Sequence, residues 1–272
     1  MNCLNCGATL SGPYCAACGQ RHDPHRPTFG HFIAETAESL SHADGRLWST
    51  LRMLLTKPGL LSKEFFGGRR ARYLPPIRLY IVLSVAFFLL LALVPDGGMS
   101  ALGDTNVRMD SKCSELTYNG PFKPMMEQKL RSACQRIKAD GGAALGNAFL
   151  QNAPKAMWLL LPVFAAILLL FYWRPRRLYA EHLLYLIHNH SAVFAALTIE
   201  ELLDLALPDQ ADSVLGPLLF GYLLWYCYRG MRVFYGDSRS RTLAKFFALA
   251  FLYFTITSLV LIFTGIAAAL SI

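Results

Sequence analysis

Charged residues are scarce in this chain of 272 residues, where Asp, Glu, Lys and Arg together make up 16% of the sequence. An ordinary soluble domain is about a quarter charged. Hydrophobic residues reach 54%, which is more than a water-facing fold can bury. The composition therefore argues against an ordinary soluble protein and predicts a membrane protein.

The motifs of several enzyme classes are also missing. The sequence has no Ser-centred nucleophile elbow, no phosphate-cradling glycine loop and no His-Glu-x-x-His zinc motif. Residues 67–70, Gly-Gly-Arg-Arg, lack the strand–loop–helix setting of a nucleotide-binding loop, so we expect a flexible joint there. Residues 1–19 lack the basic and apolar regions of a cleavable secretory signal, and insertion is expected to depend on the first transmembrane helix.

Five apolar segments are expected to cross the membrane, which makes this an all-α membrane protein of about five transmembrane helices. Three of them are continuous enough to span a hydrocarbon core of about 30 Å. The other two contain His, Glu, Asp, Gly or Pro and could instead be re-entrant or partly interfacial. The spans are expected at about residues 77–94, 157–173, 183–207, 214–235 and 246–270, of which the third and fourth are the less regular pair.

The basic residues predict the orientation of these spans. The net charge is +8, and the Lys and Arg residues cluster beside the apolar segments, where they would face anionic lipid headgroups. Nucleic acid is therefore not an expected partner. Arginines precede the first span, follow the second and follow the fourth, whereas the turn between the third and fourth holds Asp209 and Asp212 and no Lys or Arg. By the positive-inside rule the N-terminus is cytoplasmic and the C-terminus is extracytoplasmic.

Two segments outside the spans have a predicted structure of their own. Residues 23–76 form an amphipathic connector, either a soluble helical hairpin or, as we favour, helices lying in the inner-leaflet interface. Residues 95–155 form an extracytoplasmic loop in which Met125 to Lys138 could be a short helix. Cys113 and Cys134 share this oxidising compartment, so a disulfide between them is expected.

Residues 1–22 are predicted to be a zinc ribbon. Two Cys-x-x-Cys-Gly knuckles lie eight residues apart, and four thiolates at this spacing suit one tetrahedral Zn(II) per chain in a structural role. Two disulfides and an iron centre of the rubredoxin type are the alternatives. Because a segment of this length cannot build a hydrophobic core, the metal must supply its folding energy. The expected ligands are Cys3, Cys6, Cys15 and Cys18.

A family resemblance rests on two of these features together. The knuckles end in Gln20, and the run from Phe65 to Tyr73, Phe-Phe-Gly-Gly-Arg-Arg-Ala-Arg-Tyr, leads through Pro75–Pro76 into the first span. With Glu181–His182 and the later histidines, the chain resembles the bacterial domain of unknown function 3667 family. The resemblance implies a zinc-ribbon protein of the bacterial inner membrane and implies no activity.

Polar residues in and beside the spans are the remaining candidates for a site. Ionisable groups at membrane depth usually face a bundle interior, a partner or water. They could form a track for protons or a cation through the third span, or lie in the two headgroup layers. Chelation by the histidines would need a break or another helix. The residues are His182, His188, His190, Glu200, Glu201 and Asp204.

A cluster of arginines lies where the connector meets the first span. Guanidinium groups could grip lipid phosphates bidentately, or they could serve only as an orientation signal. The cluster comprises Arg69, Arg70, Arg72 and Arg78.

The expected function is non-enzymatic. The ribbon would dock a cytoplasmic protein partner, while the bundle serves as an anchor or a small transport unit in the lipid bilayer. A proton- or cation-coupled transporter or channel that uses the third span is the alternative, and a membrane enzyme acting on lipid comes third. The sequence does not specify an oligomeric state.

Overall fold

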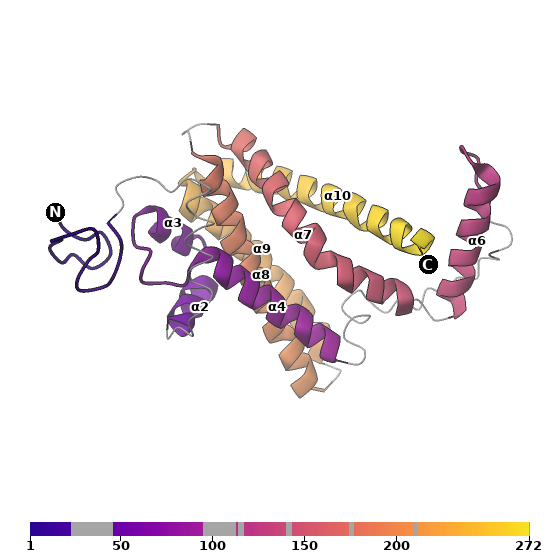
Figure 1. Cartoon of the computed structure of the whole chain (residues 1–272), viewed down its shortest axis with the longest axis horizontal. Helices are drawn as coiled ribbons and strands as arrows, with labels where there is room; N and C mark the ends of the chain where they lie inside the picture. The colour runs from indigo at the N-terminus through magenta and orange to yellow at the C-terminus, as the bar shows by residue number, and fades with distance from the viewer. Residues whose placement is uncertain are drawn as a thin grey trace. The chain divides into compact units, whose positions relative to one another are not determined.

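The computed structural model describes residues 1–22, 46–94, 113, 117–139, 143–173, 177–208 and 211–271. Within these residues the regular elements are helices, and the N-terminal ribbon adds two isolated β-bridges, Asn2 with Thr9 and Tyr14 with Arg21. Figure 1 shows the order of the helices along the chain. The all-helical prediction is confirmed for the part of the chain that the structure describes.

Three of the described helices are long and apolar enough to cross a membrane. They are α4 (Pro76–Leu93), α7 (Ala143–Phe171) and α10 (Arg239–Ser271). Their apolar windows cover Pro76–Leu93, Pro154–Phe171 and Arg239–Val260. The helices α8 (Tyr179–Ala206) and α9 (Asp212–Tyr235) form where the third and fourth spans are expected, but neither is among these three. Five crossings therefore stay a prediction.

Hydropathy located the apolar parts of these helices better than their ends. α7 begins at Ala143 and α10 begins at Arg239, both well before the expected spans. Helix formation needs only an unbroken backbone ladder, so polar residues can extend a helix beyond its apolar part. The connector gives two described helices, α2 (Leu47–Thr56) and α3 (Leu60–Phe66), while its residues 23–45 lie outside the described residues.

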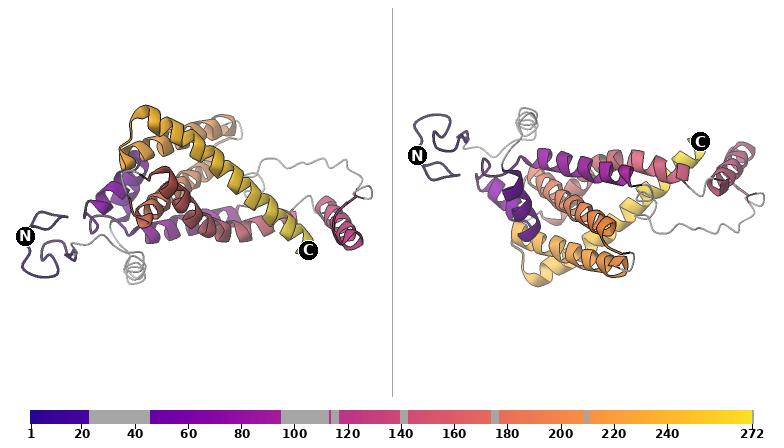
Figure 2. Two further views of the ribbon diagram at one scale, coloured as in Figure 1. Left: turned by 90° about the horizontal axis from the view of Figure 1, so that it is seen from above. Right: turned by 90° about the horizontal axis from the view of Figure 1, so that it is seen from below.

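Contacts within the chain define two compact units, and α4, α7 and α10 each contribute to both. The first unit comprises Met1–Phe87 and Leu161–Ala250. Within it α8 contacts α9, α2 and α3, and α3 also contacts α9 (Figure 2). Side chains from α8 residues 181–188 are all buried, so this half of α8 is enclosed by protein. A helix that is buried on every side belongs in the middle of a bundle.

The second unit comprises Phe88–Leu160 and Phe251–Ile272, and it includes α6 (Lys123–Ala139). This helix lies where the short amphipathic helix of the outer loop is expected. Cys113 and Cys134 are bonded in the structure, with their Cα atoms 5.7 Å apart. The Glu127 carboxylate accepts a hydrogen bond from the Tyr118 amide at 3.0 Å, which ties the chain before α6 to the first turns of that helix.

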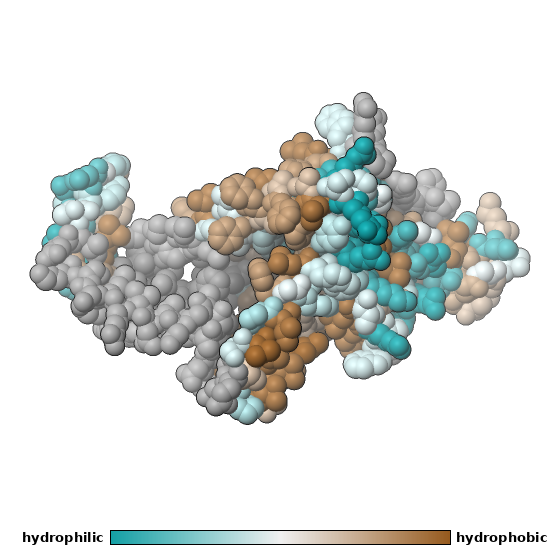
Figure 3. Space-filling view, turned by 180° about the vertical axis from the view of Figure 1, so that it is seen from behind, coloured by the Kyte–Doolittle hydropathy of each residue, from teal (hydrophilic) through white to brown (hydrophobic). Residues whose placement is uncertain are grey.

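Apolar side chains remain exposed along the candidate membrane helices. On α10, Phe247, Phe251 and Phe254 are 63%, 70% and 72% exposed. Figure 3 shows broad apolar surface on one face of the molecule. Large exposed apolar side chains in this number suit contact with lipid or with another protein. Membrane association follows from this surface and from the three apolar windows together.

Candidate metal centre and its connections to the bundle

The two cysteine knuckles bring four sulfur atoms together. In each knuckle a glycine amide bonds back to the first cysteine, Gly7 to the Cys3 carbonyl at 2.9 Å and Gly19 to the Cys15 carbonyl at 2.8 Å. The four Sγ atoms all lie within 4.8 Å of one another. Two pairs across the knuckles, Cys3–Cys18 and Cys6–Cys15, are 3.7 Å and 3.5 Å apart.

These distances fit one tetrahedral metal ion. Four sulfurs bound at about 2.3 Å from a central ion stand roughly 3.8 Å from one another. A disulfide would require a separation of about 2.0 Å, which neither cross-knuckle pair approaches. Within the described residues, these cysteines are the group of three or more potential ligands that converges on one point. The four thiols could therefore hold a metal ion, as the spacing predicts.

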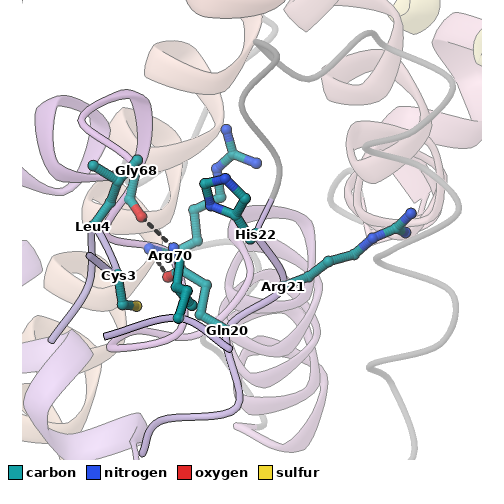
Figure 4. A pocket seen from close by; sticks show the side chains of 8 residues that line it. Cys3, Leu4, Gln20, Arg21, His22, Gly68 and Arg70 are labelled. Carbon is teal, nitrogen blue, oxygen red and sulfur yellow. Dashed lines mark hydrogen bonds between the residues drawn. The ribbon is translucent and has the colours of Figure 1, made fainter. Parts of the chain in front are cut away.

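Gln20, two residues after the last cysteine, connects the ribbon to the segment between α3 and α4. Its Nε2 donates to the Gly68 carbonyl at 2.6 Å. Its Oε1 accepts from the amides of Arg70 at 3.1 Å and Ala71 at 3.0 Å. Figure 4 shows Gln20 beside Gly68 and Arg70. These three residues are among those that line a cavity of about 20 Å³. Sequence reasoning placed Gln20 only in a family motif, because nothing local indicates a partner about 50 residues away.

The same segment is also tied to α2. Arg46 donates to the Ala71 carbonyl at 2.6 Å, and the buried Thr50 hydroxyl accepts from the Leu74 amide at 3.0 Å. An irregular segment must find partners for its backbone groups outside a helix. Here side chains from the ribbon and from α2 supply them, immediately before α4 begins.

The expected arginine cluster is partly engaged within the protein. Arg69 forms a two-pronged pair with Glu64, in which its Nη2 reaches Oε1 at 2.7 Å and its Nε donates to Oε2. This pairing lowers the pKa of Glu64 and raises that of Arg69. Arg70 lies over the Phe65 ring at 5.1 Å, while Arg72 is exposed. Headgroup binding by this cluster stays a prediction, and Arg72 is the member most available for it.

The three histidines of α8 have three different partners. The His182 Nδ1 lies 2.9 Å from the Tyr235 hydroxyl at the end of α9. The His188 Nδ1 lies 2.8 Å from the Ser62 hydroxyl of α3. The His190 Nδ1 bonds to the Leu186 carbonyl within its own helix at 2.9 Å. The structure does not bring the three imidazoles together, so the side chains provide no shared chelate.

The three carboxylates of α8 that are predicted as site residues lie farther along the helix than the histidines. Glu200, Glu201 and Asp204 are each partly exposed, in the last two turns. Glu200 lies near α9, since its Oε1 would be 3.9 Å from a Cβ placed on Gly216. A polar track through α8 from His182 to Asp204 stays a prediction.

Tyrosines of α9 hold the end of α2. The Tyr226 hydroxyl donates to the Leu54 carbonyl at 2.9 Å, and the Tyr222 hydroxyl donates to the Leu55 carbonyl at 2.7 Å. The last carbonyls of a helix have no partner within the helix. The two α9 hydroxyls are hydrogen-bonded to two of these carbonyls. With the contact between His188 of α8 and Ser62 of α3, they fix the α2–α3 hairpin against α8 and α9. The sequence analysis did not identify these tyrosines.

A guanidinium joins the start of α8 to the end of α9. Arg177 donates to the buried Glu181 carboxylate at 2.8 Å and to the Phe234 carbonyl at 2.8 Å. Its guanidinium carbon lies 4.5 Å from the centre of the Phe234 ring. Arg174 and Arg176, expected in the same cytoplasmic loop, lie outside the described residues.

Comparison with known proteins gives one family. Residues 44–88 match the model of a family described as "Protein of unknown function (DUF3667)". No curated protein and no solved structure matches the chain. The matched residues cover α2, α3, the segment with Arg69, Arg70 and Arg72, and the first part of α4. The match confirms the resemblance to this family over these residues.

Proposed function

We propose that this chain, a member of the DUF3667 family, is a non-enzymatic multi-pass membrane protein whose zinc-loaded ribbon is a docking module. The converging sulfurs of the four cysteines carry the proposal. Four thiolates in tetrahedral arrangement suit Zn(II), and a structural zinc site of this kind has no open coordination position for catalysis. When bound, the metal supplies the folding energy of the ribbon.

Exposed apolar side chains on the ribbon support the docking role. Tyr14 and Leu4 are 59% and 56% exposed. Aromatic side chains are enriched in protein interfaces. The partner would be a cytoplasmic protein, and the apolar helices would anchor the complex in the inner membrane with the N-terminus inside.

Metal analysis of the full-length protein tests the ribbon. The purified wild type should contain about one zinc per chain, and replacement of Cys3 and Cys6 by Ser should remove it. Cys227, which lies in α9, supplies a matched Cys→Ser control that should retain the zinc. Full zinc retention in the Cys3/Cys6 variant would refute this assignment and direct attention to the α8 histidines.

Photo-crosslinking tests the docking surface. A photoreactive residue in place of Tyr14 should yield a defined adduct with a cytoplasmic protein, and the adduct should disappear in the zinc-free variant. The same residue in place of Trp48, which is 78% exposed on α2, is the control for exposure alone. Equal adducts at both positions, with or without zinc, would contradict a docking role for the ribbon.

An interfacial position of α2 would give it an anchoring role as well. Trp48 and Arg52 are both exposed and lie one turn apart, which suits a helix lying at headgroup level. Together with Arg72 they would bring aromatic and cationic side chains to the inner leaflet.

A transporter or channel is the second candidate, since α8 carries three buried histidines, which would be costly polar groups if α8 crosses the membrane. Ion flux in proteoliposomes that is lost on changing Glu200 or Asp204 would favour it over the docking proposal. A lipid-modifying enzyme is the third, and no arrangement of the described side chains favours it.

A further inference from the structure

The segment between α3 and α4 depends on the ribbon for part of its backbone hydrogen bonding. Gln20 contacts three backbone groups of this segment, the Gly68 carbonyl and the amides of Arg70 and Ala71. A side-chain amide has two donors and one acceptor oxygen, and here both ends are used. This is a specific contact rather than a chance approach of two surfaces.

Steric fit reinforces the same contact. Gly68 has φ of +84°, and a Cβ placed on it would lie 2.6 Å from Leu4 Cδ1 and 3.1 Å from Leu4 Cβ. Leu4 of the ribbon therefore packs directly on Gly68, where any larger residue would clash with it. Between the two surfaces is the cavity of about 20 Å³, roughly the space of one water molecule.

Metal binding can control this contact because Gln20 belongs to the second knuckle. Its carbonyl accepts from the Cys15 amide at 2.9 Å, and Gly19 beside it bonds back to Cys15. Cys15 is 2% exposed and Cys3 5% exposed, so the ribbon's interior consists largely of its sulfur atoms. Without a metal to hold those sulfurs, only a few backbone hydrogen bonds of this short segment remain to fix the orientation of Gln20.

We infer that the metal-loaded ribbon is a clamp on the chain's own Gly68–Ala71 backbone. Loss of the metal opens this clamp and exposes the backbone that carries Arg69, Arg70 and Arg72. The inference rests on the proposed function, because it assumes that the ribbon binds a metal. The first partner of the docking module is then a segment of the same chain, between α3 and α4.

Protease accessibility tests the clamp on the full-length protein in detergent. Trypsin should cut after Arg69, Arg70 and Arg72 slowly in the zinc-loaded protein, and removal of the zinc by a chelator should speed these cuts. Loss of three hydrogen bonds at once should raise the rate roughly tenfold or more. Cleavage after Arg131 in α6 should not change and gives an internal reference.

Two test variants, each with a matched control, separate opening of the clamp from general unfolding of the protein. Gln20→Leu removes the three hydrogen bonds and leaves all four cysteines, so it should keep its zinc and still be cut at the accelerated rate. Gln128→Leu, at an exposed glutamine of α6, is the matched control and should behave as the wild type. If Gln20→Leu loses its zinc, Gly68→Ala provides the same test through its clash with Leu4, with Gly12→Ala, where a Cβ meets nothing within 4 Å, as its control.

The outcomes distinguish the two proposals. A wild type that contains no metal overturns the metal-loaded ribbon, and the clamp with it. A wild type that holds about one zinc but is cut equally fast with and without it refutes the clamp alone. Faster cutting in the chelated protein and in the zinc-loaded Gln20→Leu or Gly68→Ala variant, with both controls unchanged, establishes the clamp.

Discussion

Gly59 offers a sharp test of how the α2–α3 hairpin contacts α9. It lies in the turn between the two helices, with φ of +75°, and a Cβ placed on it would be 2.5 Å from the Gly230 carbonyl oxygen. The same Cβ would be 3.0 Å from the Gly230 Cα and 3.1 Å from its carbonyl carbon. Real Cβ atoms do not approach a backbone so closely, and a backbone cannot move aside as a flexible side chain can.

The cost of a Gly59→Ala substitution has two parts. A non-glycine residue in the left-handed region costs about 1–2 kcal/mol. Overpacking by a methyl group against a rigid neighbour adds about 1–3 kcal/mol. We therefore expect a loss of about 2–5 kcal/mol in the free energy of unfolding of the first unit, with the smaller value if α3 can shift away from α9.

Thermal unfolding in detergent, followed by fluorescence, would measure this loss. Gly221→Ala is the matched control, since Gly221 lies in α9 and a Cβ there meets nothing within 4 Å. The control should be as stable as the wild type or slightly more stable, because alanine favours a helix. If Gly59→Ala also unfolds like the wild type, the close approach of the turn to α9 is wrong.

Three further predictions concern separate parts of the chain. The Glu64 carboxyl has its pKa lowered by the hydrogen bond from Arg69, so its contribution to stability is present above its unfolded pKa of about 4.3 and is lost as the pH falls through the lower folded value. Melting temperatures measured from pH 6 to pH 3 should therefore fall more steeply in the wild type than in Glu64→Gln, and parallel curves would contradict the pairing. A membrane-impermeant thiol reagent should label Pro208→Cys from outside if α8 and α9 cross the membrane, whereas labelling from the cytoplasm only would leave three crossings. Non-reducing mass mapping should find Cys113 linked to Cys134 in protein from an oxidising compartment, and two free thiols there would refute the pairing.

The local parts of this structure could be predicted from the sequence. Apolar runs located α4 and the apolar windows of α7 and α10, and residue spacing located the four cysteines that converge. Each of these signals comes from residues that lie close together along the chain. Amphipathic spacing likewise indicated α6, because its polar and apolar residues alternate at helical intervals.

The long-range contacts could not be predicted from one sequence. His188 looked like a member of a polar track, but its partner is Ser62, which is 126 residues away. Gln20 and Tyr226 are similar cases, since each reaches backbone groups of a distant segment. Burial of the first half of α8 depends on α2 and α3 packing against it, and hydropathy reports only the composition of α8 itself.

The guanidinium of Arg177 has a mechanical consequence for α8 and α9. It holds Glu181 in the first turn of α8 and the Phe234 carbonyl in the last turn of α9, so these two ends are joined through one rigid planar group. The short connection between Ala206 and Asp212 joins the other two ends, so Arg177 closes the one end of the α8–α9 pair that the chain leaves open. Spin labels placed in pairs near Glu181 and Phe234 should therefore show a wider distance distribution in Arg177→Gln than in the wild type.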